Sequence, residues 1–347
     1  MTGKMTAAVL YGKEDIKIER VPIPRLGDGE VLVKVHVALT CGTDLKVYQR
    51  GYHARMIVPP ALFGHELAGT IEQVGEGVRG FKKGMRVVAL NSAPCGMCFY
   101  CSKHQLNLCE DLLFNNGAYA EYIRIPKRIV EANMLVVPSN VTFEDAAMTE
   151  PLACVLRGLH ETGVEIGETV VVIGGGPIGL MFVQVAKAIG CNVIAVVKRD
   201  SQVALARKKG AHEVVQITKV KDAVEAVREL SPERRGADVA IEAVGRPEAW
   251  EWAVQMVRKG GTVNFFGGCA LGTHVTLDTN RIHYSDITLR STFHHTPAMC
   301  RKALDLIAGG RFQAAAFITG HAHLYELNRV FEKLMNRSSE IKTAIVP

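Results

Sequence analysis

The chain has 347 residues, a length that suggests two domains. Of these residues 48% are hydrophobic and 22% charged, a composition that is typical of a globular protein and excludes disordered and collagen-like classes. Its 41 basic and 35 acidic residues leave a formal net charge of +6, and the basic pairs are scattered, so we expect no nucleic-acid partner. No apolar run approaches the ~20 residues that a bilayer requires and no signal peptide is evident, so we expect a cytoplasmic protein without membrane contact.

The first half of the chain contains short β-type runs separated by glycine and proline. These runs are Val31–Val37, Leu67–Val74, Arg86–Leu90 and Tyr119–Ile125. They predict a small β-rich domain with long loops, which extends from Met5 to about Val155.

Four of the nine cysteines are grouped within one of these loops, with gaps of two, two and seven residues: Cys95, Cys98, Cys101 and Cys109. Short gaps let neighbouring thiolates face one centre, and the longer gap lets the chain return to complete a tetrahedron, which suits Zn²⁺. Because four thiolates leave no open position, we expect this zinc to be structural. The alternative is a cluster of reduced surface thiols. For the five isolated cysteines we expect small buried side chains.

From about Thr169 the pattern changes to alternating strands and helices. Strands are expected at 170–173, 193–197, 213–217, 238–243 and 262–266, and helices at 177–189, 202–209 and 222–230. This alternation predicts an α/β fold with a doubly wound parallel sheet. The last segment is expected to form a helix at 298–308, a β-like stretch at 317–319 and a helix near 324–335.

The first strand of this region is followed directly by a glycine-rich turn that matches G-x-G-x-x-G and opens a helix. Such a turn lets the backbone approach a pyrophosphate, which the helix N-terminus then stabilises. The alternative is a plain structural turn. We expect a nicotinamide dinucleotide to bind at Gly174, Gly176, Pro177, Ile178 and Gly179.

The end of the second strand bears on the choice between NAD and NADP. An acid there would bind the adenosine ribose and repel a 2′-phosphate, but this strand runs into Lys198 and Arg199. Asp200, with Ser201, is interpreted as an N-cap of the next helix. The two cations favour NADP; alternatively they form a solvated loop and the enzyme accepts either dinucleotide.

Together these features resemble the zinc-containing medium-chain alcohol dehydrogenase family, closest to its sorbitol (polyol) and threonine dehydrogenase branch. The resemblance covers nearly the whole chain and depends on five motifs in the family's order: Cys41-Gly42-Thr43-Asp44, Gly64-His65-Glu66, the four-cysteine group, Thr149-Glu150-Pro151-Leu152-Ala153 and the glycine turn.

The resemblance implies a domain organisation that the residue pattern alone does not show. A GroES-like catalytic domain is expected from residues 1–155 and 295–347, with a structural-zinc lobe at 92–112. A Rossmann dinucleotide-binding domain is expected at 156–294. The family also implies a homodimer or homotetramer.

A second, catalytic zinc follows from the resemblance. Cys41 and His65 match the family's thiolate and imidazole ligands, Glu66 matches the neighbouring carboxylate, and Glu150 matches the third protein ligand of this branch. Either Glu66 or water would fill the remaining coordination position. Mixed sulfur, nitrogen and oxygen ligands with one open position suit a catalytic zinc. Asp44 is a candidate acceptor that would orient the ring of His65.

The implied reaction passes a hydride from an alcohol to the nicotinamide, with the alcohol oxygen activated by zinc. Thr43 matches the family's hydroxyl that takes the alcohol proton towards the cofactor ribose. Family members often have a histidine three residues further on to complete this relay, but this chain has Lys46. Either the pKa of Lys46 is depressed, or the proton leaves through water, or the cofactor faces a different outlet.

The resemblance implies an alcohol or the corresponding ketone as the substrate. Where polyol dehydrogenases commonly have an Arg-Tyr pair, this chain has Phe293-His294-His295-Thr296-Pro297. The histidines either bind substrate or are packed or solvent-facing. Loop positions near the expected pocket are Tyr48, Tyr52, His53 and 114–116. A secondary alcohol of a polyol or sugar derivative is favoured over L-threonine.

Three other functions compete with this interpretation. A non-catalytic relative could retain the zinc and dinucleotide sites without turnover. A zinc-independent quinone or enone reductase of the same superfamily would lack both sets of metal ligands. A transcription factor that uses the cysteine group lacks support from the charge distribution.

Overall fold

The structure, a computed structural model, describes residues 3–53, 55–336 and 340–347. The chain divides into two compact units, of which the first joins Met1–Ala153 to His295–Pro347 and the second comprises Cys154–His294. The expected domain boundary at residue 155 lies within helix α5 (Thr149–His160). Within the described ranges, no helix is both long and apolar enough to cross a membrane.

The first unit is built mainly from antiparallel strands. Its larger sheet has the order β10-β6-β5-β3-β18-β17, with β9 also paired to β3, and a smaller sheet has the order β2-β1-β4. The strands are β1 (Lys4–Gly12), β2 (Asp15–Pro22), β3 (Val31–Leu39), β4 (Ala61–Leu62), β5 (Glu66–Val74), β6 (Arg86–Ala89), β9 (Tyr122–Ile125), β10 (Met134–Val136), β17 (Ile318–His323) and β18 (Lys342–Val346).

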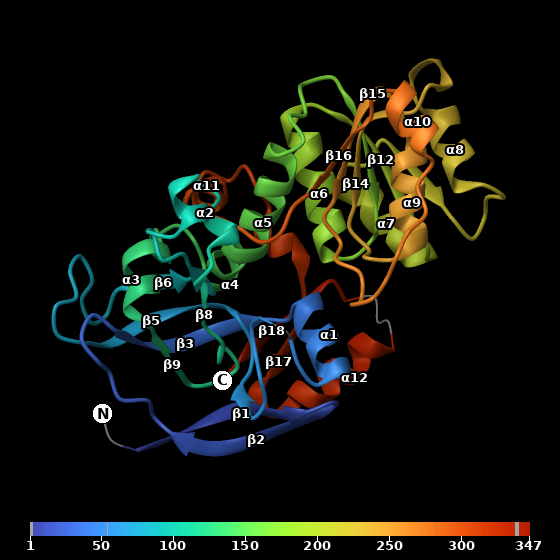
Figure 1. The fold of residues 1–347 in the computed structure, drawn as a ribbon. Coiled ribbons are helices and arrows are strands. Elements are labelled where there is room, and N and C mark those ends of the chain that lie inside the picture. The colour runs from blue at the N-terminus through green and yellow to red at the C-terminus, as the bar shows by residue number, and fades with distance from the viewer. Residues whose placement is uncertain (1–2, 54, 337–339) are drawn as a thin grey trace. The chain divides into compact units, whose positions relative to one another are not determined.

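The C-terminal segment returns to the sheet of the first unit. Strand β18 pairs antiparallel with β3, so that Ala344 lies opposite Leu39, and Figure 1 shows the red β18 beside the blue β3. The sequence predicted no strand here, because the run is short and its partner lies about 300 residues earlier in the chain. This pairing brings the start of β18 next to the residues that precede Cys41.

The helices of the first unit are short. They are α1 (Gly42–Arg50), α2 (Phe99–Ser102), α3 (Lys127–Asn133), α4 (Phe143–Ala147), α11 (Pro297–Ala308) and α12 (Leu327–Met335), with 3₁₀ turns at Leu106–Leu108, Ala314–Phe317 and Leu324–Glu326. The assignment of Tyr48 to a loop was wrong. It lies in α1, buried in the core, with its ring 5.2 Å from that of Phe331. In a helix, positions three and four residues apart share a face, which here buries Asp44, Val47 and Tyr48.

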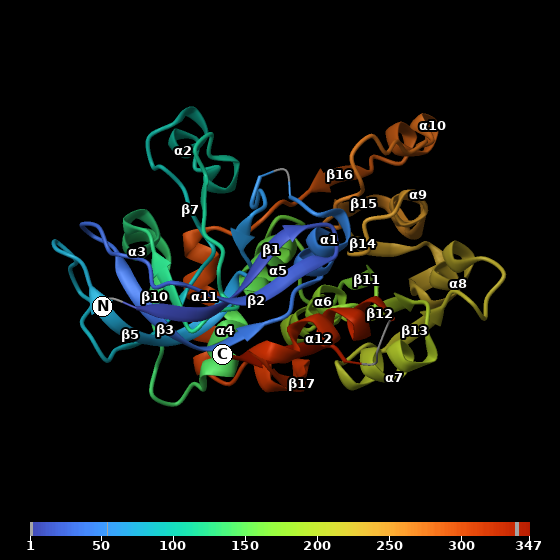
Figure 2. The same ribbon diagram turned by 90° about the horizontal axis from the view of Figure 1, so that it is seen from below.

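A lobe that contains the four grouped cysteines projects from the sheet of the first unit, as Figure 2 shows around α2. It is bounded by a two-stranded pairing of β7 (Ser92–Ala93) with β8 (Leu113–Phe114). The lobe has little apolar core of its own, since Met97 and Phe99 are exposed. A metal centre is therefore the expected source of its order.

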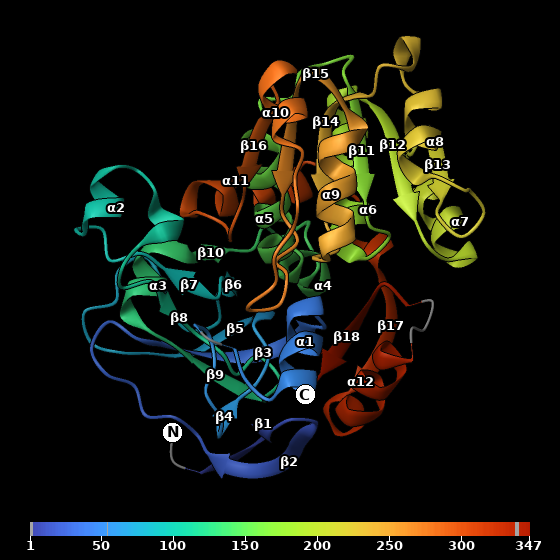
Figure 3. The ribbon, with the colours of Figure 1, turned by 45° about the vertical axis from the view of Figure 1, so that its right-hand side comes forward.

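The second unit is a six-stranded parallel sheet with the order β13-β12-β11-β14-β15-β16. Its strands are β11 (Thr169–Ile173), β12 (Asn192–Val197), β13 (Glu213–Gln216), β14 (Ala237–Glu242), β15 (Val257–Phe265) and β16 (Thr288–Ser291). Its helices are α6 (Pro177–Ile189), α7 (Asp200–Lys208), α8 (Ala223–Leu230), α9 (Pro247–Met256) and α10 (Thr279–Tyr284), with a 3₁₀ turn at Pro232–Arg234. Figure 3 shows α9 lying along the sheet.

The apolar or polar character of these strands matches how deeply each is buried in the sheet. Strand β11 is buried along its whole length, as a parallel strand covered by helices on both faces must be. Strand β16, by contrast, is exposed throughout and has no apolar pattern, which is why the sequence did not reveal it. The doubly wound parallel sheet predicted from the sequence is confirmed.

Candidate functional site

Cys41, His65 and Glu66 converge in the first unit. Cys41 follows β3 and caps the N-terminus of α1, while His65 and Glu66 are at the start of β5. Strands β3 and β5 pair with Leu39 opposite Glu66, so the two segments meet. One potential ligand atom from each of the three residues lies within 4.8 Å of the other two. The juxtaposition follows directly from the strand register.

The ring of His65 is held in one orientation by Asp44. Its Nδ1 donates to Asp44 Oδ1 over 2.8 Å, and both side chains are buried. The hydroxyl of Tyr119 donates to the other carboxylate oxygen over 2.7 Å. This confirms the hydrogen bond expected for Asp44, whereas Tyr119 was not foreseen. Because Nδ1 is occupied, Nε2 is the nitrogen available to a metal.

Tyr119 is accommodated by a glycine next to His65. Gly64 has φ +89°, and a Cβ atom there would come within 2.6 Å of the Tyr119 ring. The absence of a side chain at Gly64 therefore leaves room for the Tyr119 ring, whose hydroxyl bonds to Asp44. This gives a structural reason for the Gly-His-Glu sequence at the start of β5.

Glu150 lies in the first turn of α5, and only 6% of its surface is exposed. Glu150 is not part of the close group formed by Cys41, His65 and Glu66, so its role as a ligand remains a prediction. Burial raises the pKa of its carboxyl group to about 7, although the neighbouring His65 lowers it. A buried carboxylate of this kind is stabilised by a nearby cation.

The donor set fits a catalytic zinc. It combines a thiol, an imidazole whose Nδ1 is bonded to Asp44, and carboxylates, the mixture that such sites use. Cys41 is partly exposed, so the cluster is accessible from outside the core. The arrangement can hold a divalent metal and present it to a small molecule.

Thr43 and Lys46 both lie on α1, next to this cluster. The backbone N–H of Thr43 donates to Cys41 Sγ over 3.4 Å, and the Thr43 side chain is partly exposed. Lys46 is exposed. Thr43 is therefore adjacent to the candidate ligand and accessible, as a proton-relay hydroxyl must be.

The structure distinguishes the two neighbouring histidines, His294 and His295. His295 is buried, with Nε2 2.9 Å from Asn91 Oδ1 and Nδ1 3.3 Å from Cys300 Sγ. Both ring nitrogens therefore have partners within the first unit, which favours the packed alternative for His295. His294 has φ +68°, and its ring lies tilted beside Phe293.

The four cysteines of the lobe form a second candidate metal centre. One sulfur atom from each of them lies within 4.8 Å of the other three. Cys95 Sγ accepts hydrogen bonds from the backbone N–H groups of Met97 and Cys98, in a turn that Gly96 opens with φ +81°. The backbone N–H groups of Glu110 and Cys101 lower the pKa of Cys98 to about 6. Thiolates at this spacing fit a tetrahedral zinc.

The glycine turn lies in the second unit, between β11 and α6. Gly174 has φ +128°, and Gly176 is the N-cap of α6, with Pro177 at the first helical position. A Cβ atom on Gly179 would collide with the carbonyl oxygen of Gly174, so only glycine permits this close packing of helix on strand. A Cβ atom on Gly176 would meet nothing within 4 Å. The space beside Gly176 is thus open to a ligand.

The end of β12 differs from expectation in one respect. Arg199, not Asp200 or Ser201, is the N-cap of α7, and the side chain of Gln202 accepts from the backbone N–H groups of Lys198 and Arg199. Asp200 instead pairs with Lys219 over 2.7 Å, which its position in the first helical turn allows. Lys198 is exposed and Arg199 is partly exposed.

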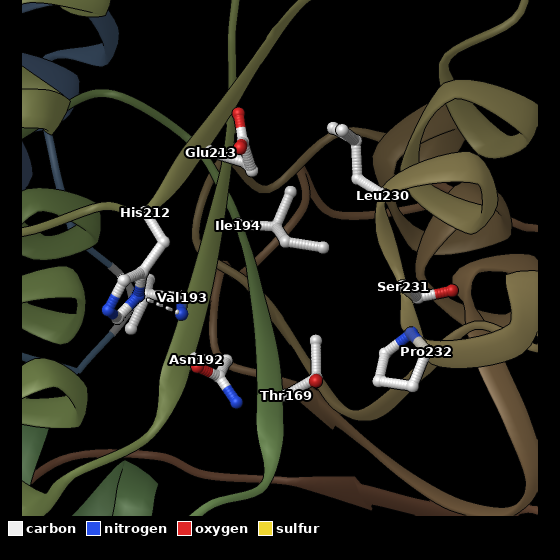
Figure 4. A pocket seen from close by; sticks show the side chains of 9 residues that line it. All are labelled: Thr169, Asn192, Val193, Ile194, His212, Glu213, Leu230, Ser231 and Pro232. Carbon is white, nitrogen blue, oxygen red and sulfur yellow. Dashed lines mark hydrogen bonds between the residues drawn. The ribbon is translucent and has the colours of Figure 1, made fainter.

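A separate pocket of about 340 Å³ opens at the amino ends of the strands of this sheet, opposite the end that the glycine turn follows (Figure 4). It is lined at the amino ends of β11, β12 and β13, and His212 Nδ1 there accepts from the backbone N–H of Val193 over 2.9 Å. Ligands of doubly wound sheets bind at the carboxyl ends of the strands. The glycine turn, not this pocket, is therefore the candidate dinucleotide site.

Comparison with known proteins agrees with this fold and these sites. Residues 27–134 match the family described as alcohol dehydrogenase GroES-like domain, and residues 177–309 match zinc-binding dehydrogenase. The chain is 31% identical to the sorbitol dehydrogenase of Bacillus subtilis (strain 168), over 99% of this chain and 97% of that protein. It is 34% identical to the L-threonine 3-dehydrogenase of Bacillus licheniformis, over 100% of both.

Among solved structures, a zinc-binding dehydrogenase of Sinorhizobium meliloti 1021 bound to NADP has a TM-score of 0.90 and 29% identity, covering 99% of this chain and 100% of that one. Fold and sites thus define a zinc-dependent dehydrogenase with a GroES-like unit and a Rossmann unit. The chain belongs to the zinc-containing medium-chain alcohol dehydrogenase family, which confirms the resemblance found in the sequence. It is an oxidoreductase that uses zinc and a nicotinamide dinucleotide.

Proposed function

We propose that this enzyme transfers a hydride between a secondary alcohol of a polyol or sugar derivative and NADP. The observation that carries the proposal is the convergence of Cys41, His65 and Glu66, with His65 oriented by Asp44. This is a donor set with a fixed imidazole and access from outside, as a catalytic zinc requires.

Within this proposal each residue has a role. Cys41, His65 and Glu66 are the residues that would hold the metal, with Glu150 as a further candidate ligand. Bound zinc supplies a Lewis acid that makes the alcohol proton easier to remove. The Thr43 hydroxyl accepts that proton and passes its own onward. Lys46 stands where the family often has a histidine, so we expect the proton to leave through water instead of through this side chain.

The second zinc has a structural role. Cys95, Cys98, Cys101 and Cys109 bind it in the lobe at 92–112, where a four-thiolate site leaves no position for substrate. Reduced cysteines of this kind suit the cytoplasm, where we place the enzyme. We also propose a homodimer or homotetramer, as in the family that the sequence resembles.

The dinucleotide binds at the carboxyl edge of the sheet in the second unit. Gly174, Gly176, Pro177, Ile178 and Gly179 receive its pyrophosphate at the N-terminus of α6. Lys198 and Arg199, at the end of β12, favour the 2′-phosphate of NADP over NAD. NADP in the Sinorhizobium meliloti structure supports this choice.

L-threonine is the second candidate substrate. The 34% identity with an L-threonine 3-dehydrogenase favours it, while the 31% identity with a sorbitol dehydrogenase favours a polyol. A catalytically silent relative is disfavoured by the intact cluster of Cys41, His65 and Glu66.

The test is a panel of secondary alcohols, polyols and L-threonine, each mixed with zinc-loaded enzyme and either NADP⁺ or NAD⁺, with reduced nicotinamide followed by absorbance. We expect NADP⁺ reduction with a polyol. A rate with L-threonine alone would establish the second candidate, and silence across the panel with both zinc ions bound would contradict the proposal.

A further inference from the structure

A hollow of about 670 Å³ in the second unit is lined largely by basic side chains. It lies at the amino ends of β14 and β15, since Arg235 precedes the first of these strands and Val257 begins the second. Because both strands run parallel to β11, the hollow is at the opposite end of the sheet from the glycine turn. None of the described residues that line it is acidic. Its basic side chains are Arg228, Arg234, Arg235, Arg258, Lys259 and Arg281.

Two of these arginines are held next to each other by the C-terminal end of helix α9. The Nη2 atoms of Arg228 and Arg281 both donate to the carbonyl oxygen of Gln255, each over 3.0 Å. Arg281 also donates to the carbonyl oxygens of Val254, over 3.2 Å, and Val257, over 2.8 Å. These bonds fix the two guanidinium groups as neighbouring positive charges.

The charge of this arginine pair is only partly neutralised. Within the described residues, neither Arg228 nor Arg281 forms an ion pair, and the acceptors of their hydrogen bonds are backbone carbonyls. The C-terminus of a helix has a charge of about −0.5, which offsets only part of two full positive charges. Burial lowers the pKa of Arg281, and the charge of Arg228 lowers it further, whereas Asp278 raises it. An anion in the hollow would be stabilised by both groups.

The remaining basic residues add to this excess of positive charge. Lys259 is exposed and forms no ion pair within the part of the chain that the structure describes. The other three arginines are paired with carboxylates that do not line the hollow. Arg234 pairs with Glu225 and Glu229, Arg235 with Glu233, and Arg258 with Asp238.

We propose that this hollow binds a small phosphorylated molecule, at a site separate from that of the dinucleotide. A guanidinium group presents a planar fork of N–H donors that matches phosphate oxygens, and five of the six basic side chains are arginines. The volume of about 670 Å³ lies within the range of sites for small organic ligands, so the phosphate belongs to a larger molecule. The site requires neither zinc nor turnover, and so goes beyond the proposed function.

The test is equilibrium dialysis of the zinc-loaded enzyme against radiolabelled inorganic phosphate and, separately, glucose 1,6-bisphosphate. A saturating nicotinamide dinucleotide is present throughout, so that neither probe can occupy the glycine turn. We expect both probes to bind, and the bisphosphate to bind more tightly, because it fills more of the hollow and meets more cations. Absence of binding, or equal dissociation constants for the two probes, would overturn the inference.

Arg228→Gln locates the binding, because it removes one charge of the pair and keeps a side chain that can donate to the Gln255 carbonyl. We expect the affinity for the bisphosphate to fall roughly 10- to 100-fold, as for the loss of a hydrogen bond to a charged group. Arg207→Gln is the matched control, since it makes the same change at an exposed position in the last turn of α7 and should leave the affinity unaltered. Unaltered affinity in Arg228→Gln would overturn the inference.

Lys259→Gln keeps the test decisive if Arg228→Gln does not fold. Lys259 is exposed, so its replacement should leave the fold intact. We expect this variant to bind the bisphosphate roughly two- to fivefold more weakly, as for the loss of an exposed charge pair. In that case, an affinity equal to that of the unmodified enzyme would overturn the inference.

Discussion

The Nδ1 atom of His65 lies 2.8 Å from Asp44 Oδ1, in a part of the first unit where both side chains are almost wholly buried. This hydrogen bond connects a candidate zinc ligand to helix α1, which also contains Thr43. It therefore couples the orientation of the imidazole to the segment proposed to relay the proton.

Replacing Asp44 by alanine removes this bond and leaves His65 free to rotate. We expect the affinity of the Cys41–His65 site for zinc to fall roughly 10- to 100-fold, as for other partners of metal-bound histidines. Competition with a chromophoric chelator measures it. Tyr119→Phe is the control, because it removes one hydrogen bond to Asp44 but leaves the bond to His65, and its effect should be smaller. Equal affinities in Asp44→Ala and the unmodified enzyme would contradict the expectation.

Replacing Thr43 by valine removes the hydroxyl and keeps the shape of the side chain. The backbone N–H that donates to Cys41 Sγ remains, so we expect zinc content to be unchanged. Turnover should fall by roughly 10²- to 10⁴-fold if the hydroxyl relays the proton. Steady-state kinetics and metal analysis check both points. Thr43→Ser should retain most of the activity, and full activity in the valine variant would exclude Thr43 from the mechanism.

Replacing Cys98 by serine removes one of the four grouped sulfurs. We expect the zinc content to fall from about two ions per chain to about one, and the thermal midpoint to decrease, because a structural zinc contributes directly to folding. Elemental analysis and a thermal melt provide the measurements. Cys269→Ser, at an isolated cysteine, should keep both ions. Retention of both ions by Cys98→Ser would refute the four-thiolate site.

Replacing Arg199 by aspartate places an acid at the end of β12. It should repel a 2′-phosphate and accept hydrogen bonds from an unphosphorylated ribose, so the ratio of kcat/KM for NADP⁺ over NAD⁺ should fall by at least about tenfold. Arg207→Asp makes the same charge change in the last turn of α7 and should leave the ratio unaltered. An unchanged ratio in Arg199→Asp would mean that the two cations do not select the cofactor.

Alanine substitutions at Gly179 and at Gly176, two positions of the glycine turn, should have different effects. Gly179→Ala forces a Cβ against the carbonyl oxygen of Gly174, so we expect the free energy of unfolding to fall by roughly 1–3 kcal/mol, as in an overpacked core. Gly176→Ala has open space around its Cβ, so it should fold normally but bind dinucleotide more weakly. Thermal melts with and without cofactor separate the two effects. A Gly179→Ala variant as stable as Gly176→Ala would contradict the packing shown here.

Several features of this protein follow from the sequence by itself. The spacing of Cys95, Cys98, Cys101 and Cys109 indicated one cluster, and the glycine turn was recognisable between a strand and a helix. Both are local patterns, in which a few neighbouring residues contain all the information. The resemblance to a known family also identified Cys41 and His65, which are only 24 residues apart, as candidate ligands.

Other features were decided only by the tertiary structure. Tyr119 reaches Asp44 from 75 residues away, and Lys342 reaches Glu66 from 276 residues away. Neither contact has a local signal, because a lone tyrosine or lysine in a sequence gives no indication of its partner. Only the pairing of β18 with β3, and the packing of the Tyr119 ring against Gly64, bring these groups to the cluster. The ligand atoms are therefore identifiable from short motifs, whereas the charges and hydrogen bonds that position them depend on how distant strands meet.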